Sequence, residues 1–263
     1  MTAIYDKTGL SGWRIEDELL QGGGALYTGH PSPQVIDAGD YGLKICGSKK
    51  GSVTNIEVVC IAGAAIDLSA SGGWADRIQV SEFDIHDSYY GIHTHDGGEY
   101  AIFSGGFLHD NVFGARISSG NILLSDMVIT GNSIGLYVTG GSNDAHGICS
   151  GLMVNHNNQN LVVSGVTNGQ TFDGCNFFGH ILGGSNLGSI EIANSKGIVF
   201  NGGQIGSTNI SIDATSRVCM RGVVLQGTVS LTVAAGAYLD AKNAHIMPGA
   251  SVTWNGQPWT GNT

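Results

Sequence analysis

The sequence has few charged residues and very little proline. Charged residues make up 12% of the 263 residues, and 4 prolines stand against 43 glycines. A coiled coil needs charged heptads and a collagen chain needs glycine at every third position, and neither pattern is present. Apolar residues still form 41% of the chain, which is enough to build a core. This composition favours many short strands joined by turns.

Positive charge is also scarce, since 11 Lys and Arg against 21 Asp and Glu give a net charge of −10. A nucleic-acid surface needs clustered Lys and Arg, so we expect no nucleic-acid partner. No apolar run reaches transmembrane length, so we expect no membrane insertion. The first residues, MTAIYDKTGL, lack the basic start and apolar centre of a signal peptide, which predicts synthesis in the cytoplasm.

The cysteines offer no disulfide framework. They are odd in number, scattered and without a C-x-x-C pair. We predict buried, reduced thiols and therefore synthesis in a reducing compartment. The five are Cys46, Cys60, Cys149, Cys175 and Cys219.

An internal repeat organises the chain. The segments FDIHDSYYGIHT, FLHDNVFGARI, VITGNSIGLYV and MVNHNNQNLVV share an apolar pair, a polar turn, and then Gly or Asn before an apolar-x-apolar strand. The second apolar position recurs every 20 to 27 residues, and Ile61 is expected to extend the series backward. The series is Ile85, Leu108, Ile129, Val154, Phe178, Ile205, Leu225 and Ile246.

Two further columns follow the same spacing. Gly91, Gly114, Gly135 and Asn160 precede the strands, and a Gly or Asn there predicts a bend with positive φ. The second column is Asn111, Asn132 and Asn157, which we interpret as a ladder of stacked turn amides.

Short strands at this period, with no helical pattern between them, must stack on their neighbours to bury their apolar sides. We therefore predict an all-β fold, a right-handed parallel β-helix solenoid of roughly eight to ten coils. Irregular coil lengths favour the right-handed form over the strict hexapeptide repeats of left-handed ones. We assign residues 1–34 to an N-terminal cap segment, 35–250 to the parallel β-helix and 251–263 to a C-terminal tail.

Both ends of such a solenoid need cover. Residues 13–20 predict a short amphipathic capping helix, ended by Gly22-Gly23-Gly24. Near the other terminus, Trp254, Pro258 and Trp259 could cover the last coil or bind a further chain.

Strand alternation predicts a row of polar side chains on one outer face. Ile92 points inward, so His93 should point outward, and Arg116 and Tyr137 occupy the same position in the next two coils. His95 lies one pleat further along the same face. This mixture suits β-elimination or epimerisation of a uronic acid. Arg116 would neutralise the carboxylate, with Tyr137 and either His93 or His95 as base and acid.

The coil sequences resemble the right-handed β-helix repeats of pectate-lyase-like proteins, a group that includes polysaccharide lyases, mannuronan C5-epimerases and phage tailspikes. The segment from Tyr90 to His95 is similar to the epimerase motif Tyr-Gly-Phe-Asp-Pro-His, with His93 and Thr94 in place of its aspartate and proline. The resemblance implies a polysaccharide substrate. Its tailspike branch implies a homotrimer that binds or cuts surface glycans, with a virion-associated or extracellular location.

The function we expect is therefore a lyase or depolymerase of an acidic, uronate-containing polysaccharide. The alternatives are a noncatalytic glycan-binding or structural tailspike, a glycoside hydrolase, and a uronate epimerase. A hydrolase needs two carboxylates about 5 to 9.5 Å apart, which the sequence does not pair. Its candidate carboxylates are Asp84, Asp96, Glu99, Asp126, Asp173 and Glu191.

Several neighbours of the row are expected to contact substrate: Tyr90, Asp96, His109, Asp144 and His146. Some of these residues have an alternative reading: Asp144 and His146 could lie in a solvated turn, and His109 could be a stacked turn residue together with His86. Arg116 could instead be a salt-bridge partner of Asp96 or Glu99. His93 and His95 could instead be a solvated pair, or could bind a metal with a third ligand from Asp96, His109 or a neighbouring coil. No signal fixes that third ligand, so we expect no metal and no cofactor.

Overall fold

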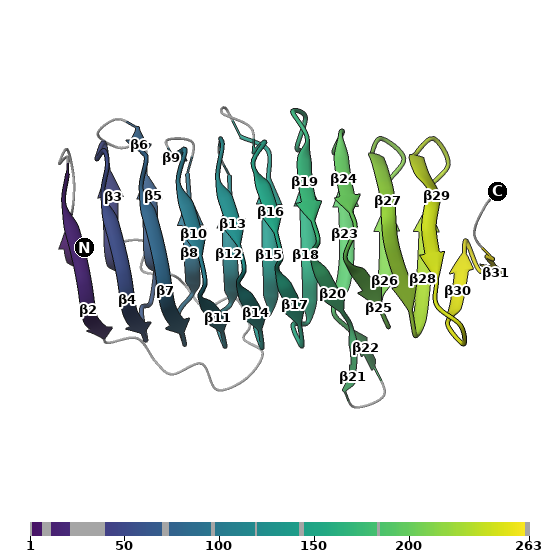
Figure 1. The fold of residues 1–263 in the computed structure, drawn as a ribbon, viewed down its shortest axis with the longest axis horizontal. Coiled ribbons are helices and arrows are strands. Elements are labelled where there is room, and N and C mark those ends of the chain that lie inside the picture. Colours follow the sequence, from purple (N-terminus) through teal and green to yellow (C-terminus); the bar gives the residue numbers. More distant parts are fainter. Residues whose placement is uncertain are drawn as a thin grey trace.

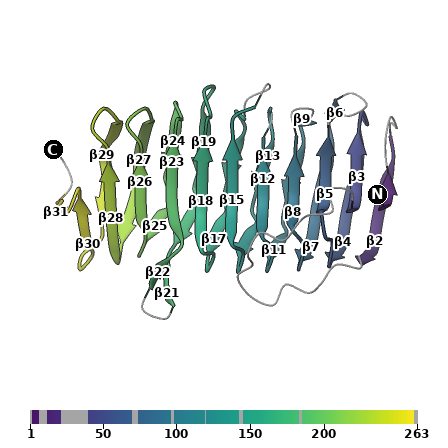
Figure 2. The ribbon, with the colours of Figure 1, turned by 180° about the vertical axis from the view of Figure 1, so that it is seen from behind.

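The chain forms a parallel β-solenoid of about 9 turns in the computed structural model. The structure describes residues 2–6, 12–21, 40–69, 74–95, 98–118, 120–141, 145–182 and 185–260. Successive coils lie side by side along the long axis, from the purple N-terminal coil to the yellow C-terminal one (Figures 1 and 2). The predicted all-β parallel solenoid is confirmed.

One face of the solenoid is a single sheet of 12 strands, and eleven of them follow one another in parallel from β1 to β30. Its strands are β1 (Thr2–Asp6), β3 (Asp40–Cys46), β5 (Ala64–Ser69), β8 (Tyr90–Thr94), β12 (Phe113–Ile117), β15 (Ile134–Thr139), β18 (Gln159–Ser164), β23 (Ser189–Ala193), β26 (Asn209–Ile212), β28 (Thr228–Val233), β30 (Ser251–Trp254) and β31 (Gln257–Pro258). The predicted outward row lies on this face.

The second sheet has 15 strands and is forked. Its long strands are β2 (Arg14–Gln21), β4 (Ser52–Val59) and β7 (Gln79–His86) at one end, and β27 (Arg217–Gln226) and β29 (Tyr238–Ile246) at the other. Between them, one branch holds β10 (Ile102–Ser104), β13 (Leu123–Ser125), β16 (Ile148–Ser150), β19 (Gln170–Asp173) and β24 (Ile198–Asn201), and the other holds β11 (Phe107–His109), β14 (Val128–Thr130), β17 (Met153–Asn155), β20 (Asn176–Phe178) and β25 (Gln204–Gly206). Two small pairs, β6 (Ala75–Asp76) with β9 (Gly98–Glu99) and β21 (His180–Leu182) with β22 (Ser185–Leu187), lie outside both sheets.

The core is a stack of inward-facing apolar side chains from successive coils. Ile92 on β8 lies between Ile66 and Ala115, and all three are fully buried. Burying a side chain of this size stabilises the fold by about 1.5 to 3 kcal/mol. Because alternate residues point inward, their neighbours are fixed on the outer face.

The predicted asparagine ladder is confirmed at the corner between β11 and β12 and at the equivalent corners. The backbone N–H of Asn111 donates to Asn132 Oδ1 at 2.9 Å, and that of Asn132 donates to Asn157 Oδ1 at the same distance. Asn132 Nδ2 also donates to the carbonyl of Leu108 at 2.9 Å. The ladder therefore satisfies buried backbone groups that the sharp corner leaves outside the sheets.

The predicted positive φ at Gly91, Gly114, Gly135 and Asn160 is wrong. The left-handed residues are those just before the ladder, including Asp110 with φ 54° and Gly131 with φ 70°. The glycines are required by space instead. A Cβ on Gly114 would lie 2.5 Å from the carbonyl oxygen of Gly135, the next glycine in the column.

The predicted capping helix is also wrong. Within residues 12–21 the structure has the strand β2, which pairs in parallel with β4, and the described part of the chain contains no helix. Ile15 and Leu20 are both buried although their spacing breaks strand alternation, because Asp17 adopts φ 54° between them. That bend gives a strand the apolar spacing of a helix. Gly22 to Gly24 lie outside the described residues.

Two members of the apolar series are displaced. Val154 lies opposite Phe177, so Phe177 and not Phe178 is the inward residue of that coil. Ile85 lies opposite Val58, so the series extends backward through Val58 and not Ile61. In both places a run of adjacent apolar residues, Phe177-Phe178 and Val58-Val59-Cys60-Ile61, left the sequence register ambiguous.

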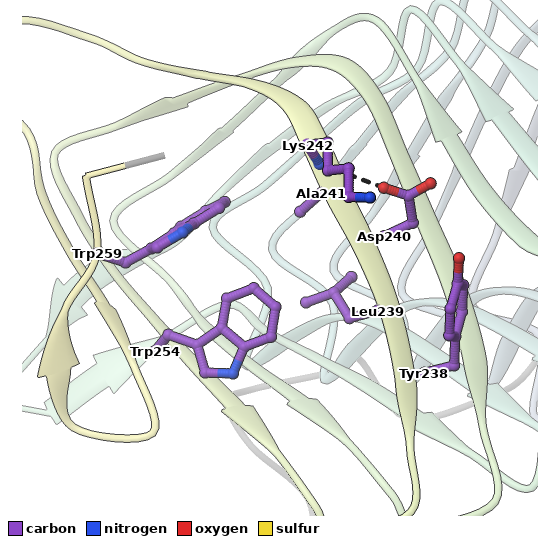
Figure 3. A pocket seen from close by; sticks show the side chains of 7 residues that line it. All are labelled: Tyr238, Leu239, Asp240, Ala241, Lys242, Trp254 and Trp259. Carbon is purple, nitrogen blue, oxygen red and sulfur yellow. Dashed lines mark hydrogen bonds between the residues drawn. The ribbon is translucent and has the colours of Figure 1, made fainter. Parts of the chain in front are cut away.

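Trp254 and Trp259 cover the C-terminal end. Their rings meet edge to face with centroids 5.3 Å apart, and both pack against the core. Figure 3 shows them around a small cleft that Leu239 and Lys242 also line. The aromatic residues near the C-terminus therefore act as a cover for the last coils.

The five cysteines form no disulfide. Four are buried as predicted, and Cys219 is half-buried. Burial raises the pKa of the Cys175 thiol to about 11, which keeps it protonated. Within the described ranges, no helix is long and apolar enough to span a membrane.

Candidate functional site

The predicted outward row is present on the 12-stranded sheet and is longer than expected. His93 on β8 lies opposite Arg116 on β12, and Arg116 lies opposite Tyr137 on β15. On the other side of His93 the parallel register places Asp67 of β5. The row therefore runs Asp67, His93, Arg116 and Tyr137 over four coils.

A buried carboxylate holds both histidines. The Oδ1 atom of Asp67 lies 3.0 Å from Nε2 of His95 and 3.3 Å from Nδ1 of His93. Asp67 is 0% exposed and His93 is 8% exposed, although both lie on the outer face of the sheet. His93 is covered because its ring stacks on Tyr90, with centroids 4.4 Å apart. His95 is half-exposed and forms the open side of this cluster.

The electrostatics of the cluster follow from burial and hydrogen bonding. Burial lowers the pKa of His93 and outweighs the opposing hydrogen bond to Asp67, so the imidazole is neutral at pH 7. Burial by itself would raise the pKa of Asp67, but hydrogen bonds from His93 and His95 outweigh it and hold the pKa below its usual value. The centre of the cluster is thus an ionised carboxylate that receives two imidazole N–H groups.

Arg116 lies between two aromatic rings. Its guanidinium carbon lies 5.8 Å from the ring centroid of Tyr90 and 5.6 Å from that of Tyr137. Its NH1 donates a hydrogen bond to the Tyr90 hydroxyl at 3.1 Å. Its Nε is buried with no hydrogen-bond partner among the described residues. The side chain is thus held in place by rings, with donor capacity left over.

The salt bridge considered for Arg116 is not made with Glu99. The Glu99 carboxylate accepts hydrogen bonds from the backbone N–H and the side-chain amide of Asn121, at 3.1 and 2.7 Å. The other candidate partner, Asp96, lies outside the described residues.

An aromatic strip borders the row, and its central residue was not identified from the sequence. Phe113 lies 5.0 Å from Tyr90 and 6.0 Å from Tyr137 between ring centroids, and Tyr89 meets Tyr90 edge to face at 4.7 Å. The signal for Phe113 was its position opposite Tyr90 in the repeat.

Asp67 was also missed. Its signal was the apolar-x-apolar segment Ile66-Asp67-Leu68, one coil before Ile92-His93-Thr94. Extending the strand column backward, in addition to the apolar series, would have found it.

His109 is separate from the row. It lies on β11, across the asparagine corner, where its ring stacks on His86 with centroids 4.8 Å apart. Its ring nitrogens face the carboxylates of Asp84 and Asp110, at 3.0 and 2.8 Å. His86 and His109 are therefore stacked as the alternative reading had it, but at the ends of the strands β7 and β11 and not in a turn.

The predicted loop over the row is only partly described. His146 is half-buried just before β16, and its backbone N–H donates to the carbonyl of Gly120 at 3.2 Å. Asp144 lies outside the described residues. The substrate contacts expected of these two residues stay predictions.

A second concave surface lies along β2, β4 and β7. Carboxylates and two exposed apolar side chains line it: Asp17, Glu18, Glu57, Glu82 and Asp84, with Leu19 and Phe107. We call it the acidic groove. Of the carboxylates considered for hydrolysis, Asp84 is the one that this groove contains.

Comparison with known proteins gives a likeness in fold. No protein-family model matches the sequence, and no curated protein matches it. Among solved structures, the chain is similar to the ORF18 protein of Geobacillus virus E2, with a TM-score of 0.41 and 13% identity. The match covers 84% of this chain and 56% of that one, so the chain spans little more than half the length of the phage protein.

Proposed function

We propose that the row around Arg116 acts on an acidic polysaccharide and cleaves it by β-elimination beside a uronate carboxylate. The observation that carries the proposal is the half-buried Arg116, which the rings of Tyr90 and Tyr137 hold in place and which, among the described residues, makes a hydrogen bond through NH1 alone. A guanidinium pairs with a carboxylate through two parallel hydrogen bonds. Such pairing makes the neighbouring C5 proton of a uronate acidic enough to remove.

The elimination needs one proton acceptor and one proton donor. The Tyr90 oxygen lies 3.1 Å from Arg116 NH1, and this cation stabilises it as a phenolate, so deprotonated Tyr90 replaces Tyr137 as our first candidate acceptor for the C5 proton. The C–H electron pair becomes the C4–C5 double bond, and the C4–O bond breaks. The leaving oxygen takes a proton from the Tyr137 hydroxyl. The proton that Tyr90 gained then passes to Tyr137 through solvent, so both side chains return to their starting states and the reaction consumes no other reactant.

A specific observation also favours a binding-only function. Tyr89, Tyr90, Phe113 and Tyr137 present a continuous aromatic strip on the outer face, and such rings stack on the apolar faces of sugars. In this second candidate the strip binds a glycan and Arg116 only pairs with its carboxylate. Tyr137→Ala would then weaken glycan binding, with no substrate consumed by the native protein.

The test is turnover on a panel of uronate-containing and neutral glycans, followed by ultraviolet absorbance of unsaturated uronate and by new reducing ends. We expect both signals to rise together on a uronate-containing glycan. Arg116→Ala should lower turnover by at least about 100-fold, because it removes charge stabilisation in the transition state. Arg116→Lys should restore only part of it, since an ammonium lacks the two-pronged geometry.

Three other results would contradict the elimination mechanism. Full activity in Arg116→Ala would overturn the mechanism. Reducing ends without absorbance would indicate hydrolysis and direct attention to the acidic groove, starting with Glu57, Glu82 and Asp84. Glycan binding without either signal would establish the binding-only candidate.

A further inference from the structure

The carboxylate of Asp67 lacks a full set of partners. It is 0% exposed, its Oδ1 faces the two imidazoles, and its Oδ2 has no hydrogen-bond partner among the described residues. Burying an ionised carboxylate is costly unless a positive charge or a complete set of hydrogen bonds compensates it. Half of this carboxylate is left without either.

The nearby protein cations do not supply that charge. Lys44 lies directly opposite Asp67 in the parallel register, but its ammonium lies over the ring of Tyr41, 5.3 Å from the centroid. Arg116 is two coils from Asp67 and is bound to Tyr90. In the part of the chain that the structure describes, the groups within ion-pair distance of Asp67 are the two histidines.

The donor atoms have the spacing of metal ligands. Three possible ligand atoms, one each from Asp67, His93 and His95, all lie within 4.8 Å of one another. The two shortest separations are 3.0 and 3.3 Å. Ligand atoms on a tetrahedral ion with bonds of about 2.1 Å lie about 3.4 Å from one another, so a small outward movement is enough to admit an ion.

The chemistry of the donors selects the kind of ion. Two imidazole nitrogens and one carboxylate oxygen suit zinc and its neighbours among the divalent transition metals. Calcium and magnesium prefer sets made of oxygen atoms alone. Three protein ligands leave at least one coordination position open, and the 44% exposure of the His95 side chain places that opening toward solvent.

We propose that Asp67, His93 and His95 bind a divalent transition-metal ion of the zinc class, with an open coordination position on the outer face next to the Arg116 row. Each imidazole then carries its proton on its other ring nitrogen, so the nitrogens that face Asp67 bind the ion, and the ion compensates the buried charge. His93 and Asp67 come from directly paired positions of β8 and β5. His95 follows directly after β8, and its backbone N–H donates to the carbonyl of Leu68 on β5 at 2.8 Å, so the backbone of all three ligands is fixed.

The experiment uses untagged full-length protein, stripped with a chelator and titrated with Zn²⁺ by calorimetry. Co²⁺ is then used as a spectroscopic probe of the same site. We expect one ion per chain, visible Co²⁺ bands, and a thermal unfolding midpoint that rises with Zn²⁺ concentration, since the ion binds the folded state. His95→Ala should weaken binding by at least about 100-fold, because it removes a direct ligand. Its half-exposed position makes it a safer variant than one at the buried Asp67.

His245→Ala is the matched control, because His245 is exposed on β29, far along the chain from the cluster. It should bind Zn²⁺ as the native protein does. No saturable binding, or equal binding by the native protein and His95→Ala, would overturn the proposal. The titration needs no glycan, so a failure to bind Zn²⁺ would not count against the proposed polysaccharide reaction. Zn²⁺ binding without glycan turnover would support the metal site and contradict the polysaccharide reaction.

Discussion

The asparagine ladder should contribute a large share of the stability of the solenoid, and Asn132→Ala tests this. Asn132 is 1% exposed. Its Oδ1 accepts from the backbone N–H and the side chain of Asn111, and its Nδ2 donates to the carbonyls of Leu108 and Thr130 and to Asn157 Oδ1. Alanine removes all five bonds, including the one to the buried backbone N–H of Asn111.

The magnitude follows from those groups. The Asn111 N–H and the Leu108 carbonyl lose an Asn132 partner, and each buried group left unsatisfied costs about 1 to 3 kcal/mol. We therefore expect a loss of about 4 kcal/mol in the free energy of unfolding. For a chain of this size that loss lowers the thermal midpoint by roughly 8 to 16 °C.

The assay is thermal unfolding followed by circular dichroism, with Asn155→Ala as the control. Asn155 is half-buried, and within the described residues its side chain makes one hydrogen bond, with the exposed ring nitrogen Nδ1 of His156 at 3.2 Å. Its replacement should change the free energy of unfolding by no more than about 0.5 kcal/mol. If the two variants melt within about 2 °C of each other, the ladder does not have the role assigned to it.

Three further predictions concern space, charge and thiol reactivity. Gly114→Ala should destabilise the protein more than Gly222→Ala, because a Cβ on Gly114 meets backbone at 2.5 Å whereas one on Gly222 has nothing within 4 Å and only the strain of φ +63°; equal thermal midpoints would contradict the steric argument. Burial opposes protonation of His86, but hydrogen bonds to neighbouring carboxylates raise its pKa above the usual value. The stability it contributes is therefore complete below about pH 6.5 and is lost as pH rises through the raised pKa, so the stability deficit of His86→Gln should shrink between pH 6 and pH 9; a constant deficit would argue against it. Iodoacetamide at pH 8 should modify the half-buried Cys219 before Cys175, whose pKa is about 11, with mass spectrometry as the readout; the reverse order would show that the buried coil opens readily.

The repeat was predictable because solenoid coils must stack in register. The apolar spacing and the column of Asn111, Asn132 and Asn157 both follow from that single requirement, and the structure has both. The predicted helix at residues 13–20 failed for a local reason, since a left-handed Asp17 inside a strand reverses the side-chain alternation. One bent residue is enough to make a strand resemble a helix in sequence.

The site was predictable as a column of residues but not as a set of contacts. Alternation placed His93, Arg116 and Tyr137 on one outer face, and the register agrees. Alternation does not say how deeply neighbouring rings cover a side chain, so the burial of His93 beneath Tyr90 was not foreseen. Side-chain alternation also could not show that both imidazoles contact Asp67, which lies 26 positions before His93.

The direction of the ladder has a mechanical consequence. Strands run across the solenoid, so the backbone hydrogen bonds between coils point along its long axis. A pull on the two ends would stretch these bonds along their own length and separate the coils one after another, because each coil contacts only its neighbours. The coils joined by Asn111, Asn132 and Asn157 carry extra bonds in that same direction, so they should be the last to part under load.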